Sequence, residues 1–178
     1  MTIRITESDG RPWRLTLRIP GWANGSEVVD PSGARRAAGP GTTSIEWPYA
    51  VGDELTLTMP ITPRWTTPDP RIDAVRGCVA LERGPIVMCA ESVDLPDGRD
   101  VDLLLVDPTV APRDEGTAVV VAARFLDVVD HAWPYVHDPT TAHDAAGTAP
   151  TDVRLRPYSG WANRGPSTMR VWLPAETG

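Results

Sequence analysis

Strict alternation of apolar and polar residues is the feature that most constrains the fold of this chain. In the segment 13–19, WRLTLRI, every second side chain is apolar, and the same period of two runs through 53–59, DELTLTM. Successive side chains of a β-strand point to opposite faces, so this period predicts strands with one buried and one solvated face. An amphipathic helical period never persists for three turns. The pattern therefore favours an all-β protein.

The remaining apolar segments are also short and separated by turn residues. Segments 26–30 and 42–47 predict brief strands, whereas 78–81 and 86–90 are nearly continuous apolar runs, as expected for strands buried on both faces. The 19 prolines and 15 glycines of the 178 residues lie largely between such segments. Short strands with turn signals between them are typical of sandwiches and barrels.

The composition changes after Glu91 from apolar strand segments to a polar segment, and this change predicts the domain organisation. The segment 92–100, SVDLPDGRD, is polar and contains both Pro and Gly, which suggests a boundary. Strand-like segments resume beyond it, and 169–174 predicts a final strand that is tied into a core. We therefore predict two consecutive antiparallel β-sandwich domains of jelly-roll type, 1–92 and 93–178.

The net charge of −7, from 24 acidic and 17 basic residues, argues against a nucleic-acid partner, whose phosphates require a basic surface. No apolar stretch has the length of a membrane span, and the first residues lack the apolar region of a signal peptide. We therefore expect no nucleic-acid or membrane partner and a cytoplasmic location.

The two cysteines, Cys78 and Cys89, form neither a disulfide framework nor a zinc signature. A two-residue turn at Arg83 and Gly84 would place them opposite each other on facing strands. Pro85 argues against that turn because it cannot donate a hydrogen bond to the ladder. We expect both thiols to be reduced and buried.

The histidines and the glutamates next to strands are candidates for catalytic or metal-binding residues. His131, His137 and His143 lie at steps of six in an acidic segment, a spacing that matches no zinc signature and favours a solvated loop. Glu46, Glu82 and Glu91 adjoin apolar strands, and we expect them to pair with arginines such as Arg76 and Arg83. A self-standing hydrolase with a cysteine or histidine–metal site remains an alternative.

Seven tryptophans offer a further functional hypothesis, because flat aromatic rings suit the apolar faces of sugars. Trp13 and Trp47 lie in predicted strands and are expected in the core. Trp161 lies in a predicted loop and, with Trp133, is the candidate for carbohydrate binding. A carbohydrate-binding module is therefore an alternative function.

Four segments together resemble the C-terminal β-sandwich region of glycoside hydrolase family 127, the bacterial β-L-arabinofuranosidases and their relatives. Order and spacing agree for 15–23, LTLRIPGWA; 47–61, WPYAVGDELTLTMPI; 79–91, VALERGPIVMCAE; and 157–174, PYSGWANRGPSTMRVWLP. The resemblance implies an N-terminal (α/α)6 barrel that performs hydrolysis. It also implies a barrel zinc ion held by cysteines and a glutamate, a cysteine nucleophile and a second glutamate as acid/base.

The barrel motifs of that family, a Glu-x-Cys segment and a Cys-Cys pair, do not occur in this chain. Cys89 matches a sandwich strand, so we assign no catalytic residue, no metal ligand and no cofactor to the chain. We expect a non-catalytic accessory portion that supports the catalytic barrel, as a domain or subunit of the same enzyme, or that mediates self-association, or both. A truncated gene product and a separate subunit fit the sequence equally, and the sugar of the parent enzyme stays open.

Overall fold

The computed structural model describes residues 1–127 and 148–176. Within these residues the chain consists of short strands and 3₁₀ turns of three residues each, without an α-helix. The predicted all-β class with antiparallel sheets is therefore confirmed. The chain divides into two compact units, Met1–Thr62 and Pro63–Gly178.

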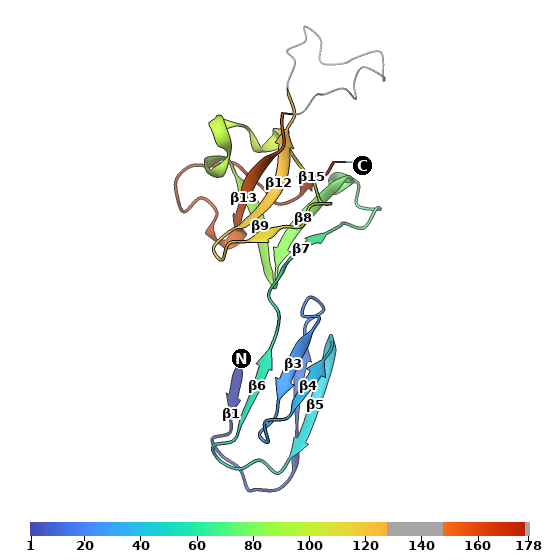
Figure 1. The fold of residues 1–178 in the computed structure, drawn as a ribbon, viewed down its shortest axis with the longest axis vertical. Helices are drawn as coiled ribbons and strands as arrows, with labels where there is room; N and C mark the ends of the chain where they lie inside the picture. The colour runs from blue at the N-terminus through green and yellow to red at the C-terminus, as the bar shows by residue number, and fades with distance from the viewer. Residues whose placement is uncertain (128–147, 177–178) are drawn as a thin grey trace. The chain divides into compact units, whose positions relative to one another are not determined.

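The first unit is a sandwich of two antiparallel sheets (Figure 1). Four strands form one sheet, in the order β1 (Thr2–Arg4), β6 (Glu54–Thr58), β3 (Ser26–Val29) and β4 (Arg35–Ala38). The other sheet has two strands, β2 (Trp13–Ile19) and β5 (Gly41–Trp47), which pair along their whole length.

The alternating residues meet between these two sheets, as their period predicted. Ile19 and Ile45 of the two-stranded sheet share one buried cluster with Leu55 and Leu57 of the four-stranded sheet. Tyr49 is also fully buried there, and its hydroxyl donates a hydrogen bond to the carbonyl oxygen of Ile45. Burial of these rows supplies the main stabilisation of the first unit.

A buried aspartate organises the turn between β3 and β4. The Asp30 carboxylate accepts hydrogen bonds from the Ser32 amide at 3.0 Å, the Ala34 amide at 3.1 Å and the Ser32 hydroxyl. Arg36 donates to its second oxygen at 2.6 Å. The hydrogen bond from the Ser32 hydroxyl lowers the pKa of Asp30 most, and the bond from Arg36 adds to it. Although burial acts in the opposite direction, the pKa falls from 3.8 to about 2. The charged carboxylate is therefore part of the folded turn.

We predict that Asp30→Ala destabilises the chain by about 1–3 kcal/mol, because it leaves buried donors without their acceptor. Since the folded pKa lies below the unfolded one, the stabilisation is complete above pH 3.8 and is lost as the pH falls towards 2. Thermal melts should therefore show a gap between wild type and variant at neutral pH that narrows below pH 4. Asp9→Ala, at an exposed loop carboxylate, is the control. Equal melts for both variants would contradict this account.

The second unit buries its core inside one curled sheet (Figure 1). Its main path is β10 (Leu104–Val106), β12 (Val119–Phe125), β13 (Thr151–Pro157), β9 (Ile86–Glu91), β8 (Cys78–Arg83) and β15 (Leu173–Pro174). Three shorter strands pair beside this path: β7 (Pro63–Thr66), β11 (Arg113–Asp114) and β14 (Met169–Arg170).

The two ends of this path meet, so the sheet curls round on itself. Val106 at the end of β10 forms a parallel bridge with Ala175, directly after β15. The Glu176 amide donates to the Val106 carbonyl at 2.9 Å. Leu81, Phe125 and other side chains from strands around the path fill the interior. The curl lets a single sheet enclose a core without a second layer.

The unit boundary lies between Thr62 and Pro63, not at 92/93 as the sequence predicted. β9 pairs with β13 through Cys89 and Arg156, so the apolar runs 78–91 belong to the second unit. The polar segment after β9 forms the 3₁₀ turns η2 (Ser92–Asp94) and η3 (Pro96–Gly98). The polar composition of this segment is that of surface turns within the second unit, not of a linker between domains.

The predicted last strand, 169–174, is two short strands instead of one. Met169 in β14 pairs with Glu91 of β9, and Leu173 in β15 pairs with Val79 of β8. β8 and β9 pair with each other only beside their hairpin turn, so the C-terminal segment pairs with each strand in turn. Leu173 is fully buried, which confirms that this segment is tied into the core.

Candidate functional site

An exposed aromatic pair follows β13 in the second unit. Tyr158 lies in the turn η5 (Tyr158–Gly160), and Trp161 follows it directly. Their side chains are 46% and 39% exposed, and their rings lie parallel within 7° at a centroid distance of 6.4 Å. Two large rings held parallel at a surface are a common element of recognition sites.

The hairpin between β8 and β9 extends this apolar surface. Gly84 and Pro85 form the two-residue turn, and Gly84 has a φ of 56°, a left-handed conformation that suits glycine. Pro85, Ile86 and Val87 line a pocket of about 270 Å³ together with Tyr158 and Ser159 of the turn after β13. We call the exposed set the aromatic patch: Pro85, Ile86, Val87, Tyr158 and Trp161.

A buried ion-pair cluster holds the loop that follows the aromatic pair. The Arg164 guanidinium donates to both oxygens of Asp94, at 2.7 and 2.6 Å, and lies 3.2 Å from the carboxylate of Glu91. Glu91 is only 1% exposed. The Ser167 hydroxyl donates to the same Glu91 oxygen at 3.3 Å. These contacts tie the loop after Trp161 to the end of β9.

The pKa shifts agree with this geometry. The hydrogen bond from Arg164 lowers the pKa of Asp94 despite the opposing effect of burial. The same bond, with the charge of Glu91 added, raises the pKa of Arg164. Both shifts favour the charged forms of the two groups, as an ion pair requires.

Neither the pKa of Cys89 nor its surroundings suit a nucleophile or a zinc ligand. Burial, with the charge of Glu91 added, raises the pKa of the Cys89 thiol to about 11, which disfavours the reactive thiolate. Cys89 is buried as predicted, and Cys78, also a free thiol, is half-buried. Residues 1–127 and 148–176 hold no group of three or more residues that could ligate a metal. The family zinc ion therefore has no fitting ligand set in the described part of the chain.

The structure places some of the tryptophans where the sequence predicted them and others elsewhere. Trp161 is exposed, but Trp133 lies outside the described residues, as do His131, His137 and His143. Among the core candidates, Trp47 packs against the first unit's core as predicted, whereas Trp13 is 38% exposed and touches Tyr49.

The arginine partners of Glu82 and Glu91 differ from the prediction. Glu91 pairs with Arg164, 73 residues along the chain (164 − 91), and Glu82 pairs with Arg64. Arg76 instead pairs with Asp73 at 3.0 Å, and Arg83 pairs with Asp114 at 2.7 Å. Sequence reasoning missed Arg164 because only the return of the chain to β9 brings it to Glu91.

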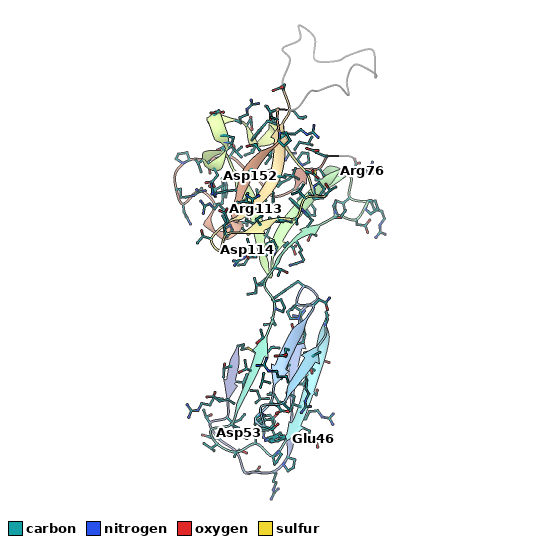
Figure 2. All side chains as sticks on the ribbon, in the orientation of Figure 1. Glu46, Asp53, Arg76, Arg113, Asp114 and Asp152 are labelled. Atoms are coloured by element: carbon teal, nitrogen blue, oxygen red, sulfur yellow. The ribbon has the colours of Figure 1, made fainter. Side chains whose placement is uncertain are left out.

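Other ion pairs lie on the outer faces of the sheets. Arg113 and Asp152 approach to 2.7 Å on the second unit, with both side chains 58% exposed (Figure 2). On the first unit, Arg14 and Glu46 join β2 and β5 at 3.2 Å. Such exposed pairs contribute little stability. The buried cluster at Glu91 is therefore the electrostatic feature that matters for this surface.

Residues 63–174 match the family model of the glycoside hydrolase family 127 C-terminal domain. The chain belongs to this family. The match begins at Pro63, where the second unit begins, and it contains the whole aromatic patch and the Glu91 cluster. No helix in the described part of this family member is long and apolar enough to cross a membrane.

Known relatives of this family 127 chain are longer proteins. It is 34% identical, over 89% of its own length, to a non-reducing end β-L-arabinofuranosidase of Bifidobacterium longum, of which it covers 25%. A crystal structure of a GH127 β-L-arabinofuranosidase from Geobacillus stearothermophilus T6 matches 98% of the chain with a TM-score of 0.74 at 28% identity. A solved glycoside hydrolase matches 99% with a TM-score of 0.81 at 23% identity, which shows the shared fold. The chain spans 28% and 30% of these two structures.

We predict that Arg164→Ala destabilises the second unit by about 3 kcal/mol, because it leaves the buried Glu91 charge unpaired. This is the lower end of the usual range, since Arg164 is itself 41% exposed. Guanidinium unfolding curves measure the change, and Arg154→Ala, which breaks an exposed pair with Glu115, should cost no more than about 1 kcal/mol.

A second variant separates lost charge from lost packing. If the unpaired charge is the cause, Glu91→Gln in the Arg164→Ala background should recover part of the lost stability. Equal unfolding midpoints for Arg164→Ala and Arg154→Ala would contradict a structural role for the cluster.

Proposed function

We propose that this chain is a non-catalytic accessory portion of a family 127 arabinofuranosidase and that its aromatic patch packs against the catalytic portion. The observation that carries the proposal is a solvent-exposed patch with Tyr158 and Trp161, directly before a loop that the Glu91 cluster ties to β9. The family match supports the enzyme class, and the length of the relatives supports a larger assembly. The Bifidobacterium relative is a non-reducing end β-L-arabinofuranosidase, which supports β-L-arabinofuranosides as the substrate class.

The chemistry of the patch favours a protein partner. Tyrosine and tryptophan are enriched at the centres of protein interfaces, where they supply most of the binding energy. The pocket beside the rings is lined by the apolar side chains of Pro85, Ile86 and Val87, with hydroxyls only from Tyr158 and Ser159. Tyr158 directly follows Pro157, which pairs with Met88 of β9, and a residue held next to a sheet loses less conformational freedom on binding. The patch is therefore suited to a stable contact with another domain.

The first test is a binding titration with the part of the Bifidobacterium longum relative that lies outside the matched region. We expect saturable binding, weakened at least about tenfold by Trp161→Ala or Tyr158→Ala, because central aromatic residues dominate such interfaces. Val110→Ala, at an exposed apolar residue outside the patch, is the matched control. Absence of binding would contradict the accessory role.

The same patch could instead bind a second copy of the chain, and this alternative has its own test. If the chain alone forms dimers that both aromatic variants dissociate, light scattering would assign the patch to a second copy instead of a catalytic portion.

We further predict that the purified chain does not hydrolyse β-L-arabinofuranosides by itself. The described residues contain no metal-ligating group, and the Cys89 thiol is held protonated. An assay with an aryl β-L-arabinofuranoside measures this directly. Turnover that disappears when one acidic residue of the chain is replaced would instead show an independent active site.

Carbohydrate binding is the second candidate function, and the parallel rings of Tyr158 and Trp161 support it. Titration of arabinose-containing oligosaccharides against intrinsic tryptophan fluorescence tests it. A saturable change that is absent in Trp161→Ala would favour a binding module, and no saturable change would favour the accessory role.

A further inference from the structure

The two sheets of the first unit differ in width. β2 and β5 form a layer of two strands opposite a layer of four. Residues 1–62 are all described, and within them neither outer edge of the two-stranded layer pairs with another strand. A two-stranded sheet is marginally stable in water by itself, and this one depends on its packing against the four-stranded layer.

The β2 edge is the more open of the two. On β5, the Ile45 carbonyl also accepts the Tyr49 hydroxyl, whereas no described backbone group outside β5 bonds to the backbone of β2. β2 runs for seven residues, Trp13–Ile19, without proline, glycine or a bulge. A long regular edge with unpaired amides and carbonyls is a template for an added strand.

The side chains along β2 show that the core is also incompletely covered there. On the inward row, Ile19 is buried, but Leu15 is only half-buried and Trp13 is 38% exposed. An added strand with apolar residues on its inward face would cover Trp13 and Leu15 while its backbone completes the ladder.

The outward row of β2 carries positive charge. Arg14 is paired with Glu46, but Arg18 is exposed and has no ion-pair partner among the described residues. In an antiparallel pairing of β2 with a second copy of itself about Thr16, Arg14 of one copy would lie opposite Arg18 of the other. Like charges directly opposite each other are destabilising. A strand from a different segment, with an acidic residue facing Arg18, fits better.

We propose that the β2 edge accepts an extended strand from the catalytic portion of the same enzyme, which completes the two-stranded sheet. This inference rests on the proposed function and adds a second contact, distinct from the aromatic patch. The match to the Geobacillus enzyme covers 98% of this chain but 28% of that protein, so a region like the first unit lies there within a longer polypeptide. Such a polypeptide has chain available to supply the strand.

Amide hydrogen exchange of the full chain tests the inference, alone and with the unmatched part of the Bifidobacterium longum relative. We expect amides within Trp13–Ile19 to exchange at least about tenfold more slowly in the complex, because an added strand bonds the outward N–H groups. Arg18→Glu should weaken the complex about fivefold by opposing the acidic partner residue. Arg4→Glu, an exposed arginine on β1 of the opposite sheet, is the matched control and should leave binding unchanged.

The other outcomes separate this inference from the proposed function. Binding with unchanged exchange in β2, or binding weakened by Arg4→Glu and not by Arg18→Glu, would overturn the strand addition and leave the accessory role standing. Complete absence of binding would overturn both. Concentration-dependent protection of β2 in the chain alone would show that a second copy occupies the edge, and would overturn the assignment to the catalytic portion.

Discussion

The contact of Arg164 with Glu91 and Asp94 is the interaction on which the exposed surface of the second unit depends. Burial of a carboxylate as an anion at the end of an apolar strand costs several kcal/mol, which a paired cation offsets. The cation comes from a loop that returns to β9 after more than seventy residues. The requirement to neutralise Glu91 therefore fixes the path of the chain after Trp161 and joins sequence-distant segments into one surface.

This dependence connects packing with function. Tyr158 and Trp161 directly precede this loop, and the pairing of Pro157 with Met88 of β9 places Tyr158 beside the β8–β9 hairpin that supplies Ile86 and Val87. The chain thus presents an aromatic surface beside a loop that ion pairs hold, while burial raises the pKa of the Cys89 thiol and disfavours its thiolate. Recognition through this surface is a coherent role for such a domain.

The sequence predicts the local structure well where periodicity dominates. The period of two in 13–19 identified β2 and its inward row, and Pro85 excluded the Arg83–Gly84 turn that would have joined the cysteines. The domain boundary and the partner of Glu91 escaped prediction for one reason. Both depend on pairing between strands far apart in sequence, as in β9 with β13, and no local composition encodes such pairing. The exposure of Trp13 was not predicted for a related reason. It depends on the number of strands in the sheet, which the sequence of one strand does not indicate.

The most direct test of the accessory role is the thermal stability of the catalytic portion of the Bifidobacterium longum relative, measured with and without this chain. A partner that binds only the folded state raises the unfolding temperature in proportion to the logarithm of its concentration above the dissociation constant. The account predicts a concentration-dependent rise that the Tyr158→Ala variant reduces. An unfolding temperature that does not change at saturating concentrations of the chain would contradict it.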